Sequence, residues 1–86
     1  MKKPAVQPWH PAPYEEADVY AIKALAAGVA NEGQQQRALG WIVNTLCGTY
    51  DLSFRDGDNA DRNTAFAEGK RFVGLQLVKL TKLVLK

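Results

Sequence analysis

The last quarter of the chain, residues 63–86, most constrains the fold, because it has the pattern of one long amphipathic helix. At about 100° per residue, its large apolar side chains fall on one stripe and most of its charged side chains fall opposite. We therefore expect a C-terminal helix, capped by Asn63 or Thr64, whose apolar face is covered by the rest of the chain. The stripe comprises Phe66, Val73, Leu77, Leu80 and Val84, widened by Phe72 and Leu83.

Two earlier segments also carry helical patterns. Residues 14–30 begin with acidic side chains, which the helix dipole favours in a first turn, and continue with apolar residues at helical spacing. Asn31 and Gln34 form a capping-box signal for a second helix that runs to Cys47, where Gly48 supplies a left-handed stop. The expected apolar positions are Val19, Ile22, Leu25, Ala26 and Val29 in the first helix, and Leu39, Ile42, Val43 and Leu46 in the second.

The sequence thus predicts an all-α fold: a small three-helix domain over residues 14–86, preceded by an extended Pro-rich arm over residues 1–13. All four prolines lie in the arm, where each removes a backbone donor and disfavours helix in the residue before it. Trp9, within the arm, has two interpretations. It packs onto the helices of its own chain, or it anchors the arm on a neighbouring subunit.

A long loop, residues 49–62, precedes the third helix and contains the turn sequence Asp56-Gly57-Asp58-Asn59. Its alternating Tyr50, Leu52 and Phe54 are expected to tuck under the loop or to form a short extended segment. The acidic residues do not match a calcium-binding loop, because positions five and twelve counted from Asp56 are alanines. We predict no metal site. Gly69, at the edge of the third helix's stripe, is expected to allow another helix to approach closely.

Catalytic chemistry has little support in this sequence. The chain of 86 residues has one histidine, His10, and one cysteine, Cys47, and it carries no nucleophile motif, phosphate loop or acid pair. We therefore predict that the protein is not an enzyme and uses no cofactor or small-molecule substrate. No apolar run approaches the length of a membrane span, and no secretion signal is evident, so we expect a soluble intracellular protein that contacts no membrane.

The net charge of +2 is unevenly distributed. Residues 1–61 contain five Lys/Arg against eight Asp/Glu, giving −3, whereas residues 62–86 contain six against one, giving +5. Four cations of the third helix share one face and could contact DNA phosphates, although the alternative is a solvated face that complements the helix dipole. These nucleic-acid-binding candidates are Arg71, Lys79, Lys82 and Lys86.

Some apolar residues of the third helix lie off its main stripe. Apolar side chains on several sides of one helix indicate that part of its outer surface is covered by another molecule. We therefore name Leu75, Val78 and Leu85, together with Trp9, as candidate partner-binding residues. The partner would be a second copy of the chain or a larger protein, as expected for a chain too short to build a large core.

The tract ALGWIVNTLCGTYDLSF followed by RNTAFAEGKRFVGLQLVKL resembles a family of small, poorly characterised proteins of tailed bacteriophages, mostly short-tailed. The match covers about half the chain, roughly residues 38–80, with Lys70 where arginine is more usual. The matching positions are Cys47, Gly48, Phe54, Thr64, Phe66, Glu68, Gly69, Lys70, Arg71, Val73, Gly74 and Leu75. The resemblance implies a late phage protein associated with head assembly, DNA packaging or the particle, and it carries over no catalytic residue.

Three functions follow as hypotheses. The first is a non-enzymatic phage assembly or virion component that acts as a homo-oligomer or docks on a larger phage structural or packaging protein. It would be found in the host cytoplasm during assembly or in the virion. The second is a DNA-binding module such as a small terminase subunit, suggested by the basic C-terminal segment. The third is a phage-encoded inhibitor of a host enzyme, which would use the exposed apolar and basic residues of the third helix.

Overall fold

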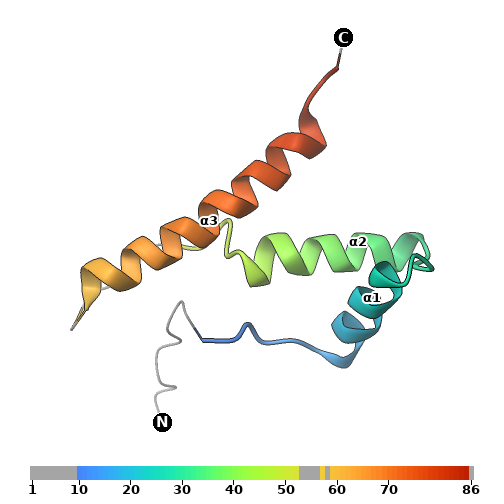
Figure 1. The fold of residues 1–86 in the computed structure, drawn as a ribbon, viewed down its shortest axis with the longest axis horizontal. Helices are drawn as coiled ribbons and strands as arrows, with labels where there is room; N and C mark the ends of the chain where they lie inside the picture. The colour runs from blue at the N-terminus through green and yellow to red at the C-terminus, as the bar shows by residue number, and fades with distance from the viewer. Residues whose placement is uncertain (1–9, 53–56, 58, 86) are drawn as a thin grey trace.

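The computed structural model describes residues 10–52, 57 and 59–85, and its described residues contain helices and no strand (Figure 1). The helices are α1 (Glu16–Ala26), α2 (Glu32–Gly40), η1 (Trp41–Leu46) and α3 (Ala60–Lys82). Because η1 is a π-helical continuation of α2, the two form one continuous unit, which we call the rod. With α1 and α3 the chain has three helical units, and the predicted all-α fold is confirmed.

The helix termini follow local rules. The predicted capping box of α2 is confirmed, since Gln34 N donates to Asn31 Oδ1 over 2.8 Å and Asn31 N donates to Gln34 Oε1 over 3.0 Å. The first helix is shorter than predicted, because it ends at Ala26 and Gly28 adopts a left-handed φ of +75°.

The α2–η1 rod changes geometry where the sequence turns to aromatic and β-branched residues. In η1 the bonding pattern widens by one residue, and Cys47 N donates to the carbonyl of Ile42 over 2.9 Å. Gly48 then ends the rod with a left-handed φ of +58°, as predicted. The chain folds back at once, because Thr49 donates to the carbonyl of Val43 from both its N–H (3.2 Å) and its Oγ1 (2.7 Å).

The third helix is displaced from its predicted limits. It begins after Asn59, which adopts a left-handed φ of 65°, and it ends at Lys82, so that residues 83–85 are not helical. Asn63 is therefore not a cap but a buried residue inside the helix. Of the two alternatives predicted for the loop, tucking under it is wrong at Tyr50 and Leu52, because both side chains are exposed. Phe54 lies outside the described residues.

The face that α3 turns toward η1 is its small-residue face, not its large apolar stripe. Asn63, Ala67 and Gly74 are buried. The predicted stripe, in contrast, stays open to solvent: Phe66 is 47%, Val73 is 51% and Leu80 is 64% exposed. The expectation that the chain covers this stripe is therefore wrong. The buried face of α3 lies about a quarter-turn of the helix away from the stripe. The widening residues Phe72, Leu83 and Val84 are exposed as well.

The absence of a side chain at Gly74 explains this orientation. A Cβ atom at this position would overlap Thr49 Oγ1 and lie 2.9 Å from the Cβ of Cys47, so only glycine lets α3 approach the end of η1 this closely. We predicted this role for Gly69, and that prediction is wrong within one copy of the chain. A Cβ at Gly69 would meet nothing within 4 Å.

Small residues also make the contact between α1 and α2. Ala21 and Ala38 are the most buried apolar residues at this contact, with exposed fractions of 1% and 0%. Of the apolar positions predicted for these helices, only Val43 is buried, and Ile42 and Ile22 are half-buried. The rest are exposed, namely Val19, Leu25, Ala26, Val29, Leu39 and Leu46.

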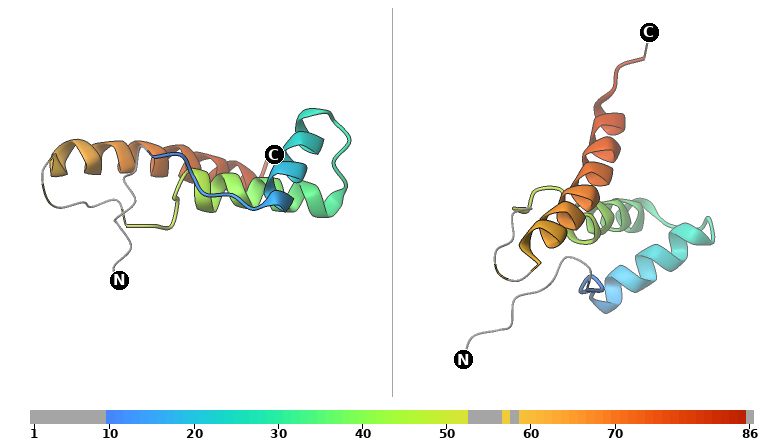
Figure 2. Two further views of the ribbon diagram at one scale, coloured as in Figure 1. Left: turned by 90° about the horizontal axis from the view of Figure 1, so that it is seen from below. Right: turned by 60° about the vertical axis from the view of Figure 1, so that its left-hand side comes forward.

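The resulting molecule is flat and open. α1 packs on α2, and α3 packs on η1, so α1 and α3 lie toward opposite ends of the rod (Figures 1 and 2). The extents are 43 × 39 × 19 Å, and the radius of gyration is 15.1 Å, whereas a compact domain of this length has about 12 Å. The accessible surface is 7073 Å², against about 5000 Å² for a compact monomer of this mass.

The Gly74 contact generates a prediction. Gly74→Ala should lower the free energy of unfolding by about 1–3 kcal/mol, because the added methyl group forces α3 away from Thr49. Gly40→Ala is the matched control: Gly40 has helical φ and ψ of −60° and −43° and open space around its Cβ direction, so alanine should raise stability by up to about 1 kcal/mol. Urea unfolding followed by circular dichroism measures both. Equal effects of the two substitutions would contradict the close-approach explanation.

Candidate protein-contact surface

The most extensive feature on α3 is its uncovered apolar face. We name the α3 stripe by its residues Phe66, Gly69, Val73, Leu77 and Leu80, of which only Leu77 is half-buried and the others are exposed. The C-terminal part of α3 extends past the rod, so no other described helix lies beside it (Figure 1). Such a row of large apolar side chains in solvent is typical of a protein-contact surface.

A cavity of about 320 Å³ adjoins the first half of the stripe. Phe66, Val73 and, at its edge, Lys70 line it from α3, Leu46 lines it from η1, and residues 10–12 line it from the N-terminal segment. The segment before α1 reaches this position because it runs back along the rod (Figure 2), where Trp41 Nε1 donates to the carbonyl of Pro13 over 3.0 Å. The stripe and this cavity therefore form one apolar surface.

A second hollow, of about 510 Å³, lies on the other side of α3. Leu75 and Arg71 line it from the helix, and residues 49–52 line it from the loop. Leu75 is 38% exposed. We name this feature the Leu75 hollow. Of the α3 stripe and the Leu75 hollow, only the hollow contains a residue that we predicted from the sequence to bind a partner, namely Leu75.

The other predicted partner-binding residues differ in their positions. Val78 is half-buried on α3, one helical turn from Leu75, and Leu85, which is 84% exposed, lies beyond the end of the helix. Trp9 lies outside the described residues. The exposed stripe was missed as a contact surface because its regular spacing has the same pattern as a helix face buried in the chain's own core.

The predicted cationic group does not form one uniform patch. Arg71 is half-buried, and its NH1 lies 3.4 Å from Glu68 Oε1, in an ion pair between residues three apart on the helix. Lys79 and Lys82 are exposed in the last turn of α3, where positive charge complements the helix dipole. Lys86 lies outside the described residues.

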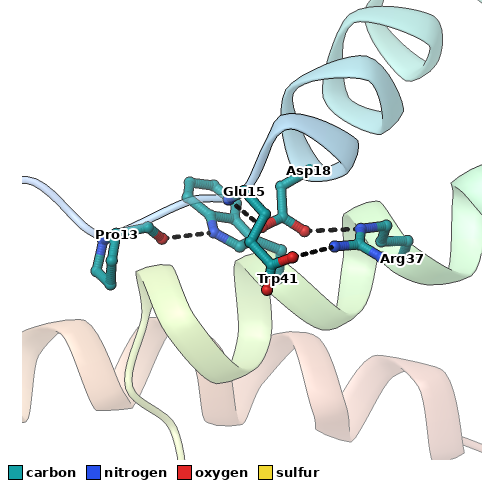
Figure 3. A network of polar contacts seen from close by, with 5 residues as sticks. All are labelled: Pro13, Glu15, Asp18, Arg37 and Trp41. Atoms are coloured by element: carbon teal, nitrogen blue, oxygen red, sulfur yellow. Dashed lines mark hydrogen bonds and ion pairs between the residues drawn. The ribbon is translucent and has the colours of Figure 1, made fainter.

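A polar network joins α1 to α2, as Figure 3 shows. Asp18, which is buried, accepts a hydrogen bond from Glu15 N over 2.8 Å and another from Arg37 Nε over 2.9 Å, and Arg37 also lies 3.7 Å from Glu15 Oε2. The Glu15 N–H and the Arg37 guanidinium hold the pKa of the Asp18 carboxyl below its ordinary value of 3.8, against the burial that raises it. This network has a structural role, because it fixes the start of α1 on α2.

The remaining candidates for chemistry lie apart. Cys47 is buried at the end of η1, and His10 is exposed near the start of the described segment. Among the described residues, no three His, Cys, Asp or Glu side chains gather closely enough to hold a metal ion. Asp56 and Asp58 of the acidic turn lie outside this set. None of the helices in the described part of the chain has the length and apolar character needed to cross a bilayer.

Comparison of the chain with known protein families, with curated proteins and with solved structures found no match. The resemblance to small proteins of tailed phages therefore stays a prediction from the residues that carry it.

The Asp18 network predicts a pH dependence. Because the folded-state pKa is lowered, the carboxylate contributes stability above pH 3.8 that is lost as the pH falls through the lowered value. Asp18→Asn should therefore be less stable than the parent at neutral pH and should lose less stability on acidification. Urea unfolding of both proteins at a series of pH values measures the free energy of unfolding. The difference between the two values at each pH isolates the contribution of Asp18 from that of the other carboxylates. Parallel acid profiles would contradict the assigned role.

Proposed function

We propose that this chain is a non-enzymatic bacteriophage assembly or virion component that acts through protein–protein contacts, in the context of head assembly or DNA packaging. The observation that carries the proposal is the exposure of the large apolar side chains of α3. The resemblance of residues 38–80 to small proteins of tailed phages supports the phage context. On this proposal the protein is found in the host cytoplasm during assembly or in the particle.

The physical argument starts from the small core of a single copy. The buried apolar residues of the described chain are mostly small, namely Ala21, Ala38, Val43, Cys47 and Ala67. Burying an apolar side chain stabilises by about 1.5–3 kcal/mol for a residue of leucine size, and one copy gains little of this from its larger residues. Contact with another protein would bury the larger apolar side chains and gain this stabilisation. A role in an assembly therefore fits the distribution of apolar surface better than a role as an isolated monomer.

The Leu75 hollow is the surface we assign to a larger phage protein. It combines the apolar Leu75 with the ion pair Glu68–Arg71 at its edge and the exposed Tyr50 on the loop side. An apolar centre with polar and aromatic groups around it is the usual composition of a protein interface.

Binding to purified capsid, portal and packaging proteins of a short-tailed phage tests the proposal. We expect one of them to bind the full chain, and Leu75→Glu to weaken that binding at least about tenfold, since it places a charge in the contact. Leu75→Met, which keeps the volume and apolar character, is the matched control and should bind like the parent. Absence of binding to all three classes of phage protein would overturn the proposal.

DNA binding is the second candidate, and the exposed Lys79 and Lys82 at the end of α3 favour it. Arg71 weakens it, because its guanidinium is engaged by Glu68. Gel shifts over a salt series separate the candidates, since binding through phosphates is tightest at low salt and is lost steeply as salt rises. Salt-sensitive binding that Lys79→Gln/Lys82→Gln removes would favour the DNA-binding module over the protein-contact role. No described feature separately favours the third hypothesis, an inhibitor of a host enzyme.

A further inference from the structure

We propose that the α3 stripe is a self-association surface, on which a second copy of this chain packs its own α3 stripe in a two-fold contact near Gly69. The inference deepens the proposed function, on which it rests for its context, by naming one partner and the surface that receives it. It uses a different face of α3 from the Leu75 hollow. A dimer formed through the stripe therefore leaves the hollow open to a larger protein.

The stripe is suited to meet a copy of itself because it carries no charge. On a helical wheel, the sector from Phe72 through Gly69 and Leu80 to Leu77 spans about 140°. Between residues 65 and 80 the side chains in this sector are apolar except for Gln76. Lys79 and Lys70 lie just beyond the two edges of this sector, and Lys82 lies opposite it, so two stripes can meet with the cations at the rim of the contact and not within it.

Gly69 supplies the geometry. It lies in the stripe between Phe66 and Val73, one turn away on either side, and a Cβ atom built on it would meet nothing within 4 Å. This glycine costs about 1 kcal/mol of helix propensity relative to alanine, and no contact within its own copy requires it. The gap between two exposed large side chains forms a notch into which an apolar side chain of a facing helix fits.

The accessible surface area of the chain agrees with a second copy as the molecule that covers the α3 stripe. The chain exposes 7073 Å², about 2000 Å² more than a compact monomer of its mass. This excess is of the same order as the area that an obligate homodimer buries, about 1000–2500 Å² per subunit. A two-fold contact also requires a patch that complements itself, which an uncharged row of large apolar side chains with a notch provides.

Sedimentation velocity of the purified full chain over a concentration series tests the proposal. We expect the parent to sediment at twice the 9.5 kDa mass of one chain. Val73→Glu should raise the dimer dissociation constant by roughly 30-fold or more, as expected for an exposed apolar side chain one helical turn from the centre of the contact. Lys82→Gln is the control, because it changes the net charge by the same amount on the side of α3 opposite the stripe, and it should leave the dimer intact.

A second variant keeps the test independent of folding defects. Gly69→Cys, in which the new side chain has open space within its own copy, should form a disulfide-linked dimer under mild oxidation. The parent, whose only cysteine is the buried Cys47, should form none. Circular dichroism shows whether each variant keeps its helices.

Two results would overturn the inference: a parent that stays monomeric at millimolar concentration, or a folded Val73→Glu variant that dimerises like the parent. If Val73→Glu loses its helices, the cross-link decides, and failure of Gly69→Cys to cross-link overturns the inference. The outcomes separate it from the proposed function. A monomer that binds a phage protein removes the self-association surface alone, whereas a dimer that binds none of them removes the assembly role alone.

Discussion

The close approach of α3 to the end of η1 at Gly74 determines most of the structure. Because a side chain at this position would collide with Thr49, the glycine fixes which face of α3 turns inward. That face is composed of small residues, so the backbones lie close and the contact area is modest. The large apolar side chains of α3, which lie about a quarter-turn away, are consequently left facing solvent.

The same preference recurs at the other end of the rod, where Ala21 and Ala38 join α1 to α2 and the Asp18–Arg37 pair fixes the start of α1. With α1 and α3 packed toward opposite ends of the rod, neither helix covers the apolar residues of the other. A single copy is thus a scaffold of close helix contacts with little hydrophobic burial. This division of roles, with small residues inside and large apolar residues outside, suits a protein that completes its core by assembly.

Sequence reasoning was reliable where a rule depends on neighbouring residues. The Asn31–Gln34 cap and the left-handed Gly48 depend only on residues a few positions apart, and each is confirmed. Periodicity also identified α3 as a helix. It could not identify what covers the stripe, because a face buried in the same chain and a face buried by a partner have the same spacing. For the same reason, nothing local distinguished Gly74, which meets Thr49, from Gly69, which meets nothing in its own copy.

The central claim is that a second molecule of this chain covers the large apolar residues of α3. Its most direct test is the urea-unfolding midpoint of the parent chain at a series of protein concentrations. If folding is coupled to self-association, the midpoint rises with concentration, because mass action favours the associated folded state. We expect this rise, together with its loss when the stripe is disrupted. A midpoint independent of concentration, with full helix content at the lowest concentration, would contradict the account.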